Sequence, residues 1–254
     1  NLLERLIIEI LFFLTFLTFS ANIRLDIELA EREEKMKYYR RSIEQVINEY
    51  KEQFPILLLT GPRQVGKSTL FKLLIGLQQS PAKAIYFGNQ DISDIPLSKL
   101  RNSIAYVPTQ SYLLSTTIED NIKFGKELPM HESVEVAAKK ADLYRDLGNL
   151  LDNDLHTLAE EGHDLSGGQK QRISMARGFY KNAPYVLLDD CFSALDAVTV
   201  TTILNTLHSV KEQTILCISQ RLEVVEKADK ILVFDEGRIV EEGTHKELLA
   251  NNGL

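Results

Sequence analysis

In LSGGQKQRISMARGFYKNAPYVLLDDCFSALD (165–196), three signals that decide the fold follow one another. A polar, glycine-rich turn comes first, a stretch of helical pattern follows it, and the apolar run YVLLDD (185–190) comes last. An apolar run that ends in two carboxylates is typical of a buried strand whose end faces a polar site. Asp189 and Asp190 are therefore candidate site residues.

Other apolar runs flank this stretch and predict further strands. They are ILLLT (56–60), TILCIS (214–219) and KILVFD (230–235). The last two, like YVLLDD, each follow a stretch of helical pattern. Strands that alternate with helices predict an α/β fold with a mostly parallel sheet.

Further patterns complete the expected layout. The stretch AIYFGNQDI (84–92) predicts a hairpin around its central Gly-Asn pair. Residues 112–182 are mainly helical in pattern, and EEGTHKELLANNG (241–253) predicts a terminal helix with a glycine at its end. Arg172 and Arg177, on the helix after the glycine-rich turn, are expected to face solvent or acidic neighbours.

The segment after the first strand fits the phosphate-loop pattern G-x-x-x-x-G-K-[ST]. It lies between a strand and a helix, which is the context that the pattern requires. Its glycines let main-chain N–H groups and a helix N-terminus face phosphate oxygens. Lys67 is expected to reach the β- and γ-phosphates, and Ser68 to ligate Mg²⁺. The predicted nucleotide-binding residues are Gly61, Pro62, Arg63, Gln64, Val65, Gly66, Lys67, Ser68 and Thr69.

Asp189 supplies the second half of the predicted nucleotide site. A carboxylate at the end of a central strand can bind the Mg²⁺ complex directly or through water. This signal is weak by itself, because many buried strands end in Asp. Beside a phosphate loop it becomes strong.

Charge and residue composition argue against several other kinds of function. The formal net charge of -7 argues mildly against broad non-specific binding of nucleic acid. The two cysteines, Cys191 and Cys217, have no CxxC spacing, so they are expected to be small packing residues in a reducing compartment. The five histidines are scattered, without the spacing of metal ligands.

Together with the phosphate loop, the opening stretch resembles the nucleotide-binding domain of ATP-binding cassette (ABC) transporters. The resemblance covers about residues 61–250, and several motifs occur in the family's order. The matching segments are Gln110 in YVPTQ (Q-loop), Leu165 to Gln169 (signature motif), Asp189 (Walker B), Ser193 to Asp196 (D-loop), and the exporter-like TTIEDNIKFG (116–125) and EEGHDLSGGQ (160–169).

The resemblance implies an ATPase with a P-loop NTPase fold, in which an α-helical signature subdomain (about 112–182) is inserted into a domain of residues 55–254. It implies that Asp189 binds Mg²⁺ and that Gln110 senses Mg²⁺ and the attacking water. Two such domains pair head to tail around two ATP molecules, so the signature of one chain clamps the γ-phosphate held by the other. A hydroxyl, free N–H groups and the start of a helix suit that clamp. Its residues are Ser166, Gly167, Gly168 and Gln169, with the helix expected to begin near Gln169.

Two predicted catalytic positions depart from the family's pattern. The family usually has Glu where this chain has Asp190, whose carboxylate is one methylene, about 1.5 Å, shorter in reach. A displaced base can lose about 10²–10⁴ in rate. In place of the usual switch histidine, Gln220 can donate to the γ-phosphate but cannot carry charge. The pattern is similar to the degenerate-site subunit of heterodimeric exporters, and a slow homodimer is the alternative.

The N-terminal part does not follow the family. Residues 1–30 contain an apolar run, 6–23, which is barely long enough to span a bilayer and carries Glu9. A membrane segment, or the remnant of one, and a core or interface helix both remain open. Residues 31–54 predict an amphipathic helix. The stretch 36–71 resembles the start of bacterial AAA-type ATPases, which also use a phosphate loop.

The sequence thus predicts an ATP-binding, ATP-hydrolysing subunit of an ABC-type exporter whose own site is slow. It would use ATP and Mg²⁺, pair with a second nucleotide-binding domain in a heterodimer, and act with a transmembrane domain at the cytoplasmic face of the plasma membrane. Nucleic acid is not an expected partner. A non-transport ABC ATPase, an AAA-like regulatory ATPase and a non-functional fusion fragment are the alternatives.

Overall fold

The computed structural model describes residues 56–62, 67–80, 85–87, 90–124, 132–145, 147, 157–159, 162–210, 213–235 and 238–251. The apolar run 6–23 and the predicted helix 31–54 lie outside these residues. No helix of the described ranges is long and apolar enough to cross a lipid bilayer.

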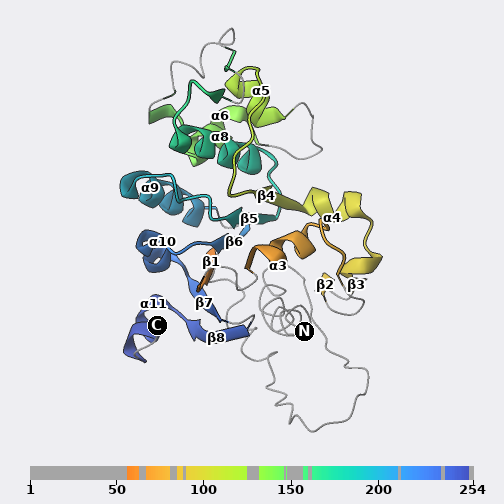
Figure 1. Cartoon of the computed structure of the whole chain (residues 1–254), viewed down its shortest axis with the longest axis vertical. Helices are drawn as coiled ribbons and strands as arrows, with labels where there is room; N and C mark the ends of the chain where they lie inside the picture. The colour runs from red at the N-terminus through yellow and green to blue at the C-terminus, as the bar shows by residue number, and fades with distance from the viewer. Residues whose placement is uncertain are drawn as a thin grey trace.

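A six-stranded sheet with the strand order β4-β5-β6-β1-β7-β8 forms the centre of the described part (Figure 1). Neighbouring strands pair in parallel, except that β8 pairs antiparallel with β7. This confirms the predicted α/β class with a mostly parallel sheet. The strands are β1 (Ile56–Thr60), β4 (Ile104–Val107), β5 (Tyr185–Asp189), β6 (Thr214–Ile218), β7 (Lys230–Asp235) and β8 (Arg238–Gly243).

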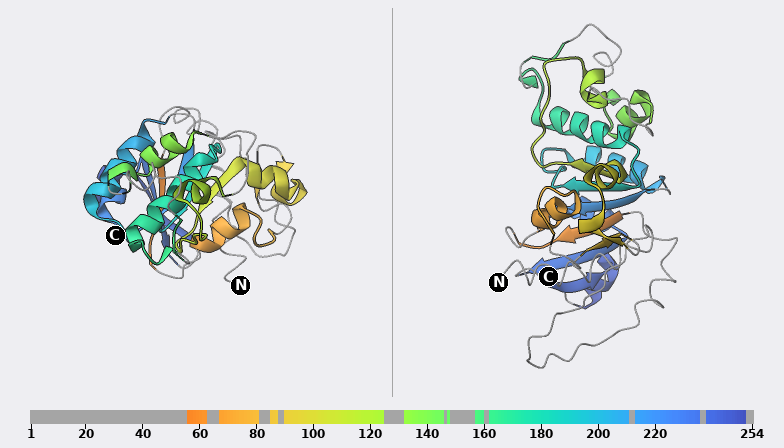
Figure 2. Two further views of the ribbon diagram at one scale, coloured as in Figure 1. Left: turned by 90° about the horizontal axis from the view of Figure 1, so that it is seen from above. Right: turned by 90° about the vertical axis from the view of Figure 1, so that its right-hand side faces the viewer.

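Helices cover both faces of this sheet. Seen from above, α3 and the pair α9 and α10 lie on opposite sides of the strands (Figure 2). Helices α5 and α6 both pack on α8 and lie with it beyond the β4 edge (Figure 1). The bounds are α3 (Lys67–Leu74), η1 (Ile92–Asp94), α4 (Leu97–Ser103), α5 (Ile118–Lys123), α6 (Val134–Lys140), α8 (Gly167–Tyr180), α9 (Ala197–His208), α10 (Leu222–Lys227) and α11 (His245–Ala250).

The central strand β1 is apolar throughout because both of its faces are covered. Ile56 and Leu58 belong to a hydrophobic cluster on one face, whereas Leu57 and Leu59 belong to a second cluster on the other. The second cluster also contains Phe71 and three leucines of α3. A parallel strand buried on both faces loses the apolar–polar alternation of a half-exposed strand, as ILLLT does.

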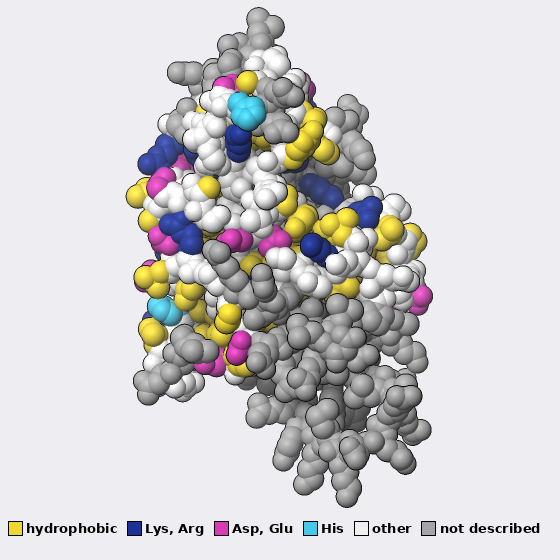
Figure 3. All heavy atoms as spheres, viewed as in Figure 1, with side chains coloured by type: hydrophobic (Ala, Val, Ile, Leu, Met, Phe, Trp, Pro, Cys, Tyr) yellow, Lys and Arg dark blue, Asp and Glu magenta, His cyan; other side chains and the backbone are white. Residues whose placement is uncertain are grey.

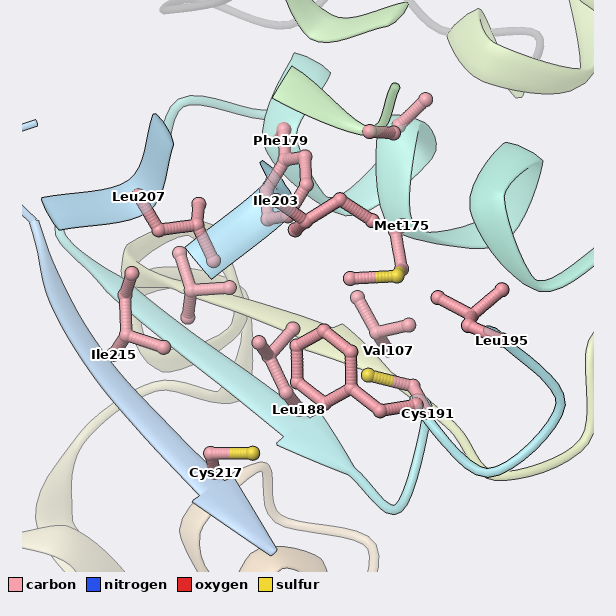
Figure 4. Packing of buried hydrophobic residues seen from close by; sticks show 14 of the residues in the cluster. Val107, Met175, Phe179, Leu188, Cys191, Leu195, Ile203, Leu207, Ile215 and Cys217 are labelled. Atoms are coloured by element: carbon pink, nitrogen blue, oxygen red, sulfur yellow. The ribbon is translucent and has the colours of Figure 1, made fainter. Parts of the chain in front are cut away.

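Figure 4 shows part of the first cluster, in which Met175 of α8 and Ile203 of α9 pack toward Leu188 of β5. Cys191 and Cys217 lie in the same cluster, and both are fully buried. Burial in apolar surroundings raises the pKa of both thiols. The prediction that they are packing residues is confirmed.

The predicted strands agree closely with the structure, since β1 and β7 have the bounds of ILLLT and KILVFD. The predicted hairpin forms β2 (Tyr86–Phe87) and β3 (Gln90–Asp91). The terminal helix was predicted too long, because residues 241–243 belong to β8 and α11 begins at His245. The signature helix α8 begins at Gly167, two residues before the predicted start.

Arg172 and Arg177 were expected to face solvent or acidic neighbours, but the contacts of both lie largely with main-chain oxygens. Arg172 is 6% exposed and donates from Nη1 to the Asp142 main-chain oxygen at 2.6 Å. Arg177 donates to the main-chain oxygens of Asn121 and Tyr112, and its guanidinium lies 4.4 Å from the centre of the Phe124 ring. Both guanidinium groups therefore tie α8 to loops and helices that pack on it.

Candidate functional site

The carboxyl ends of β1, β5 and β6 bring the predicted site residues together. The parallel register pairs Leu59 of β1 with Ile218 of β6, and Ile218 in turn with Asp189 of β5. Gly61, Asp190 and Gln220 therefore follow these strands at one edge of the sheet. Ligands of open α/β sheets bind outside the carboxyl ends of the strands, where the order of connection reverses. Here β1 lies between β6 and β7, the later strands of the chain.

The turn after β1 lies tightly against β7. Gly61 has a φ of 127°, and a Cβ atom placed on it would lie 2.0 Å from the Phe234 main-chain oxygen. Only glycine fits this turn without displacing β7. The predicted residues Arg63, Gln64, Val65 and Gly66 lie outside the described residues. Lys67, Ser68 and Thr69 form the first turn of α3.

Lys67 points back at the turn that precedes its helix. Its Nζ donates to the main-chain oxygens of Gly61, at 2.8 Å, and Pro62, at 2.6 Å. Burial lowers the pKa of Lys67, while the negative charges of Asp190 and Asp189 act in the opposite direction. The ammonium group thus lies between a phosphate-loop turn and two carboxylates.

Asp189 is the centre of the hydrogen-bond network. It is 4% exposed, and its Oδ1 accepts from the Ser68 hydroxyl at 2.9 Å. Its Oδ2 accepts from the Tyr106 hydroxyl at 3.0 Å, and its main-chain oxygen accepts from the Thr109 hydroxyl at 2.9 Å. These three donors lie on α3, on β4 and on the turn after β4, whereas Asp189 ends β5. The position of Asp189 is therefore set by contacts with three other segments.

Asp190 occupies an uncommon main-chain conformation. Its φ of 48° is left-handed, and its N–H donates to the Ile218 main-chain oxygen at 2.9 Å. Among residues other than glycine, Asp and Asn tolerate this conformation best. The backbone here thus suits the short carboxylate that the sequence places at this position.

Gln220 connects β6 to the phosphate-loop turn. Its Nε2 donates to the Gly61 main-chain oxygen at 2.6 Å. The next residue, Arg221, donates from Nη1 to the main-chain oxygens of Phe192, at 2.9 Å, and Leu195. Its other nitrogens pair with Glu223 at 3.0 and 3.2 Å. Consecutive side chains therefore hold the turn after β1 and the turn after β5.

Gln110 lies on the turn after β4 and is exposed. The turn itself is fixed on both sides of this residue, because Gln171 of α8 donates to the Pro108 main-chain oxygen and accepts from the Ser111 hydroxyl. The preceding residue, Thr109, makes the contact with Asp189 described above. The structure thus places Gln110 beside the site, one residue beyond the side chain that reaches Asp189.

The signature residues form a second group, at the start of α8. Ser166 is the N-cap, and its hydroxyl accepts from the Gln169 N–H at 3.2 Å while the Gln169 side chain accepts from the Ser166 N–H at 2.8 Å. Cβ atoms on Gly167 and Gly168 would meet Ala194 of the D-loop segment, at 3.9 and 3.0 Å. The signature therefore packs on the same turn that Arg221 holds.

The side chains at the first group fit a magnesium–nucleotide complex. Mg²⁺ prefers oxygen ligands and is usually held by one or two protein groups together with phosphates. The Ser68 hydroxyl and the Asp189 carboxylate are such oxygens, and they lie within hydrogen-bond distance of each other. Lys67 provides the positive charge that phosphates require.

Sequence reasoning missed three of these residues: Tyr106, Thr109 and Arg221. The signal for Thr109 was its place beside the predicted Gln110. Tyr106 and Arg221 carried no local signal. The acceptor of Tyr106, Asp189, is distant in the sequence. The acceptors of Arg221, on Phe192 and Leu195, lie on the turn after β5, whereas Arg221 follows β6.

The chain is similar to known proteins of one family. The family model described as ABC transporter matches residues 45–193, which begins inside the stretch that resembles AAA-type ATPases. A probable multidrug resistance ABC transporter ATP-binding/permease protein of Bacillus subtilis is 42% identical over 197 residues, covering 77% of this chain and 34% of that protein. An ATP-dependent lipid A-core flippase of Saccharophagus degradans is 41% identical over 198 residues, with the same shares.

A solved structure is also similar. The structure of a bacterial Atm1-family ABC exporter with ATP bound superposes with a TM-score of 0.72 at 35% identity, covering 79% of this chain and 36% of that one. The chain thus spans about a third of the length of the relatives that it matches.

Proposed function

We propose that this chain, which belongs to the ABC transporter family, is the ATP-binding and ATP-hydrolysing part of an exporter. We propose also that its own site hydrolyses ATP slowly. The observation that carries the proposal is the joint placement of Lys67, Ser68, Asp189 and Gln220 around the turn at Gly61. The relatives named above are a probable multidrug resistance ABC transporter protein, a lipid A-core flippase and an Atm1-family ABC exporter, which supports the exporter branch.

Each residue has a distinct role in this proposal. Lys67 neutralises the β- and γ-phosphates, and Ser68 and Asp189 hold Mg²⁺. When bound, Mg²⁺ neutralises charge on the phosphate oxygens. Asp190 and Gln220 face the γ-phosphate side, where a base and a positioning group act on water.

The slow rate follows from the reach and main-chain conformation of Asp190. The left-handed φ of 48° suits Asp, whose carboxylate is shorter in reach than that of Glu by about 1.5 Å. A base outside hydrogen-bond reach of the water loses about 10²–10⁴ in rate. Gln220 already donates to the Gly61 main-chain oxygen, so only its second amide N–H remains for phosphate. ATP would therefore be held and cleaved slowly.

The test is ATP turnover by the full chain beside the double variant Asp190→Glu/Gln220→His, with Lys67→Ala as the blank. We expect the parent to bind ATP but turn over near the blank, and the double variant to gain about tenfold or more. Asp190→Asn is the matched control, because it keeps the size and the left-handed preference and removes the base. Rapid ATP turnover by the parent that is lost in Asp190→Asn would contradict the slow site. A double variant with no more turnover than Lys67→Ala would contradict the ATPase assignment.

We propose further that the signature of this chain acts on a nucleotide held by a second domain in a heterodimer. Within one chain the signature packs on Ala194. The capping box involves the N–H groups of Ser166 and Gln169, and the N–H groups of Gly167 and Gly168 lie between them at the start of α8. These groups suit a phosphate brought by another chain.

The heterodimer is tested by sedimentation with and without ATP. The chain alone should stay monomeric, and it should associate with a nucleotide-binding domain of its own transporter that carries Glu and His at the positions of Asp190 and Gln220. The Ser166→Arg substitution should abolish that association without weakening ATP binding by the chain itself. An ATP-driven homodimer would contradict the heterodimer and support the slow homodimer.

A groove beside β4 is the proposed contact with the transmembrane domain. Its cavity is about 410 Å³, and Leu77 and Phe124 at its wall are 61% and 47% exposed. Its lining also includes Arg101, Lys123 and Arg177. Figure 3 shows hydrophobic and basic side chains side by side on this face, over α4 and toward α5. A helix with apolar and acidic side chains would complement both.

Fractionation of the native cells tests this contact. The tagged chain should sediment with membranes, and Phe124→Ser should release most of it into the soluble fraction. Leu249→Ser is the control, because Leu249 is 64% exposed on α11, away from the groove. Equal release by both variants, or by neither, would contradict the groove as the docking surface.

A further inference from the structure

We infer that Tyr106 is a positioning residue for Asp189, so that the wall of the groove and the magnesium side of the nucleotide site share one residue. The inference rests on the proposed function, because it assigns a new residue to that site.

The hydrogen bonds to Asp189 show how the carboxylate is held. Ser68 donates to Oδ1 at 2.9 Å and Tyr106 donates to Oδ2 at 3.0 Å. A carboxylate with a donor on each oxygen is fixed in rotation as well as in place. Once Ser68 turns toward a metal ion, the Tyr106 hydroxyl is the donor described here that still orients the carboxylate. Outer partners of this kind commonly set the affinity of a metal site.

Tyr106 is itself fixed from two sides. It pairs with Leu187 in the register of β4 and β5, and its ring meets Phe71 of α3 edge-on, with centroids 6.4 Å apart and an interplanar angle of 88°. A tyrosine hydroxyl is protonated at neutral pH, so Tyr106 can act as a donor to the carboxylate.

The same residue also lines the groove. Tyr106 belongs to its wall together with Ile104 and Ala105 of β4 and Gly178 of α8. A helix in the groove would thus pack against the residue that orients Asp189. This contact would connect the docking surface to the metal side of the site through one residue.

The experiment measures binding of a fluorescent ATP analogue in EDTA and in saturating Mg²⁺, for the full chain and for Tyr106→Phe. The ratio of the two affinities reports the contribution of Mg²⁺. We expect Tyr106→Phe to lower the Mg²⁺-dependent gain about tenfold, the usual effect of removing an outer partner, and to leave the affinity in EDTA unchanged. Because Phe keeps the ring, its Tm and its sedimentation with membranes should stay close to those of the parent.

Tyr185→Phe is the matched control. Tyr185 is a half-buried tyrosine at the other end of β5, so its loss removes a hydroxyl from the same sheet without touching Asp189. Equal Mg²⁺-dependent gains for the two Phe variants, or a lower Tm for Tyr106→Phe with the gain unchanged, would overturn the positioning role alone. A parent with no Mg²⁺-dependent binding of the analogue would instead overturn the proposed function.

Discussion

At Gly61 the main chain passes so close to β7 that a single methyl group decides whether the turn can form. A Cβ atom at residue 61 would lie 2.0 Å from the Phe234 main-chain oxygen. In addition, residues that carry a Cβ atom rarely adopt the φ of 127° found here. We expect Gly61→Ala to lower the free energy of unfolding by at least about 2 kcal/mol, because both strain and displacement of β7 oppose it.

Urea unfolding of Gly61→Ala beside Gly167→Ala measures this. At Gly167 an added Cβ meets its nearest atom, on Ala194, at an ordinary 3.9 Å. That variant should unfold within about 0.5 kcal/mol of the parent, as surface substitutions do. If both variants lose equal stability, the close approach of the turn to β7 is not the cause.

Among the elements, the turn between β5 and α9 depends on Arg221. Its guanidinium donates to two main-chain oxygens of that turn and pairs with Glu223 at the same time. A lysine has one nitrogen and cannot make this fork of contacts. We expect Arg221→Lys to lower stability by about 1–2 kcal/mol and to speed amide exchange in residues 192–196.

Hydrogen exchange followed by mass spectrometry checks the Arg221 prediction. The control is Glu223→Gln, which removes the ion pair and leaves the contacts with Phe192 and Leu195 in place. Faster exchange in residues 192–196 for Arg221→Lys but not for Glu223→Gln supports the assignment. The same exchange in both variants would mean that the ion pair, rather than the contacts with the turn, holds the segment.

The elements also show how far sequence reasoning reaches. The strands β1, β5, β6 and β7 were predicted because a buried parallel strand is an uninterrupted apolar run. Strand β4 was not, since Ile104 follows the last residue of α4 directly and no turn residue separates them. Residues 241–243, the last part of β8, were read as helix because their pairing with β7 is a contact between strands that the local pattern of EEGTHKELL does not contain.

The candidate site was predictable to a similar extent. The phosphate-loop residues and Asp189 carry short patterns, and the structure places the described ones, Gly61, Lys67 and Ser68, near Asp189. The buried arginines, Tyr106 and Arg221 were beyond reach, because their hydrogen-bond acceptors are main-chain oxygens or carboxylates on other elements. The identity of an acceptor far away in sequence leaves no periodicity to detect.

For the whole molecule, the two buried thiols link stability to pH. The raised pKa values of Cys191 and Cys217 mean that, above about pH 8.5, the thiols ionise in the unfolded chain but not in the folded one. The folded state then binds more protons, so stability present below this pH is lost as the pH rises. The slope reaches at most about 1.4 kcal/mol per pH unit for each thiol.

Urea unfolding between pH 7.5 and about pH 9.5 tests the linkage, because the window brackets the ordinary thiol pKa. The Cys217→Ala variant should be less stable at neutral pH, owing to its cavity, yet show a shallower decline toward high pH than the parent. A thiol reagent should label neither cysteine of the folded chain and both after unfolding. Parallel declines for parent and variant would show that other groups control the alkaline side.

The place of β1 in the sheet has a consequence for synthesis on the ribosome. This strand leaves the ribosome before the other strands of the central sheet, yet its two partners, β6 and β7, begin only at Thr214 and Lys230. Such distant pairing makes folding slow and exposes apolar segments for longer. Residues 56–60 therefore lack their partner strands until β6 and β7 have been translated. The turn at Gly61 can take its final form only then. A nascent chain stalled before β6 should be a substrate for chaperones and should not bind ATP.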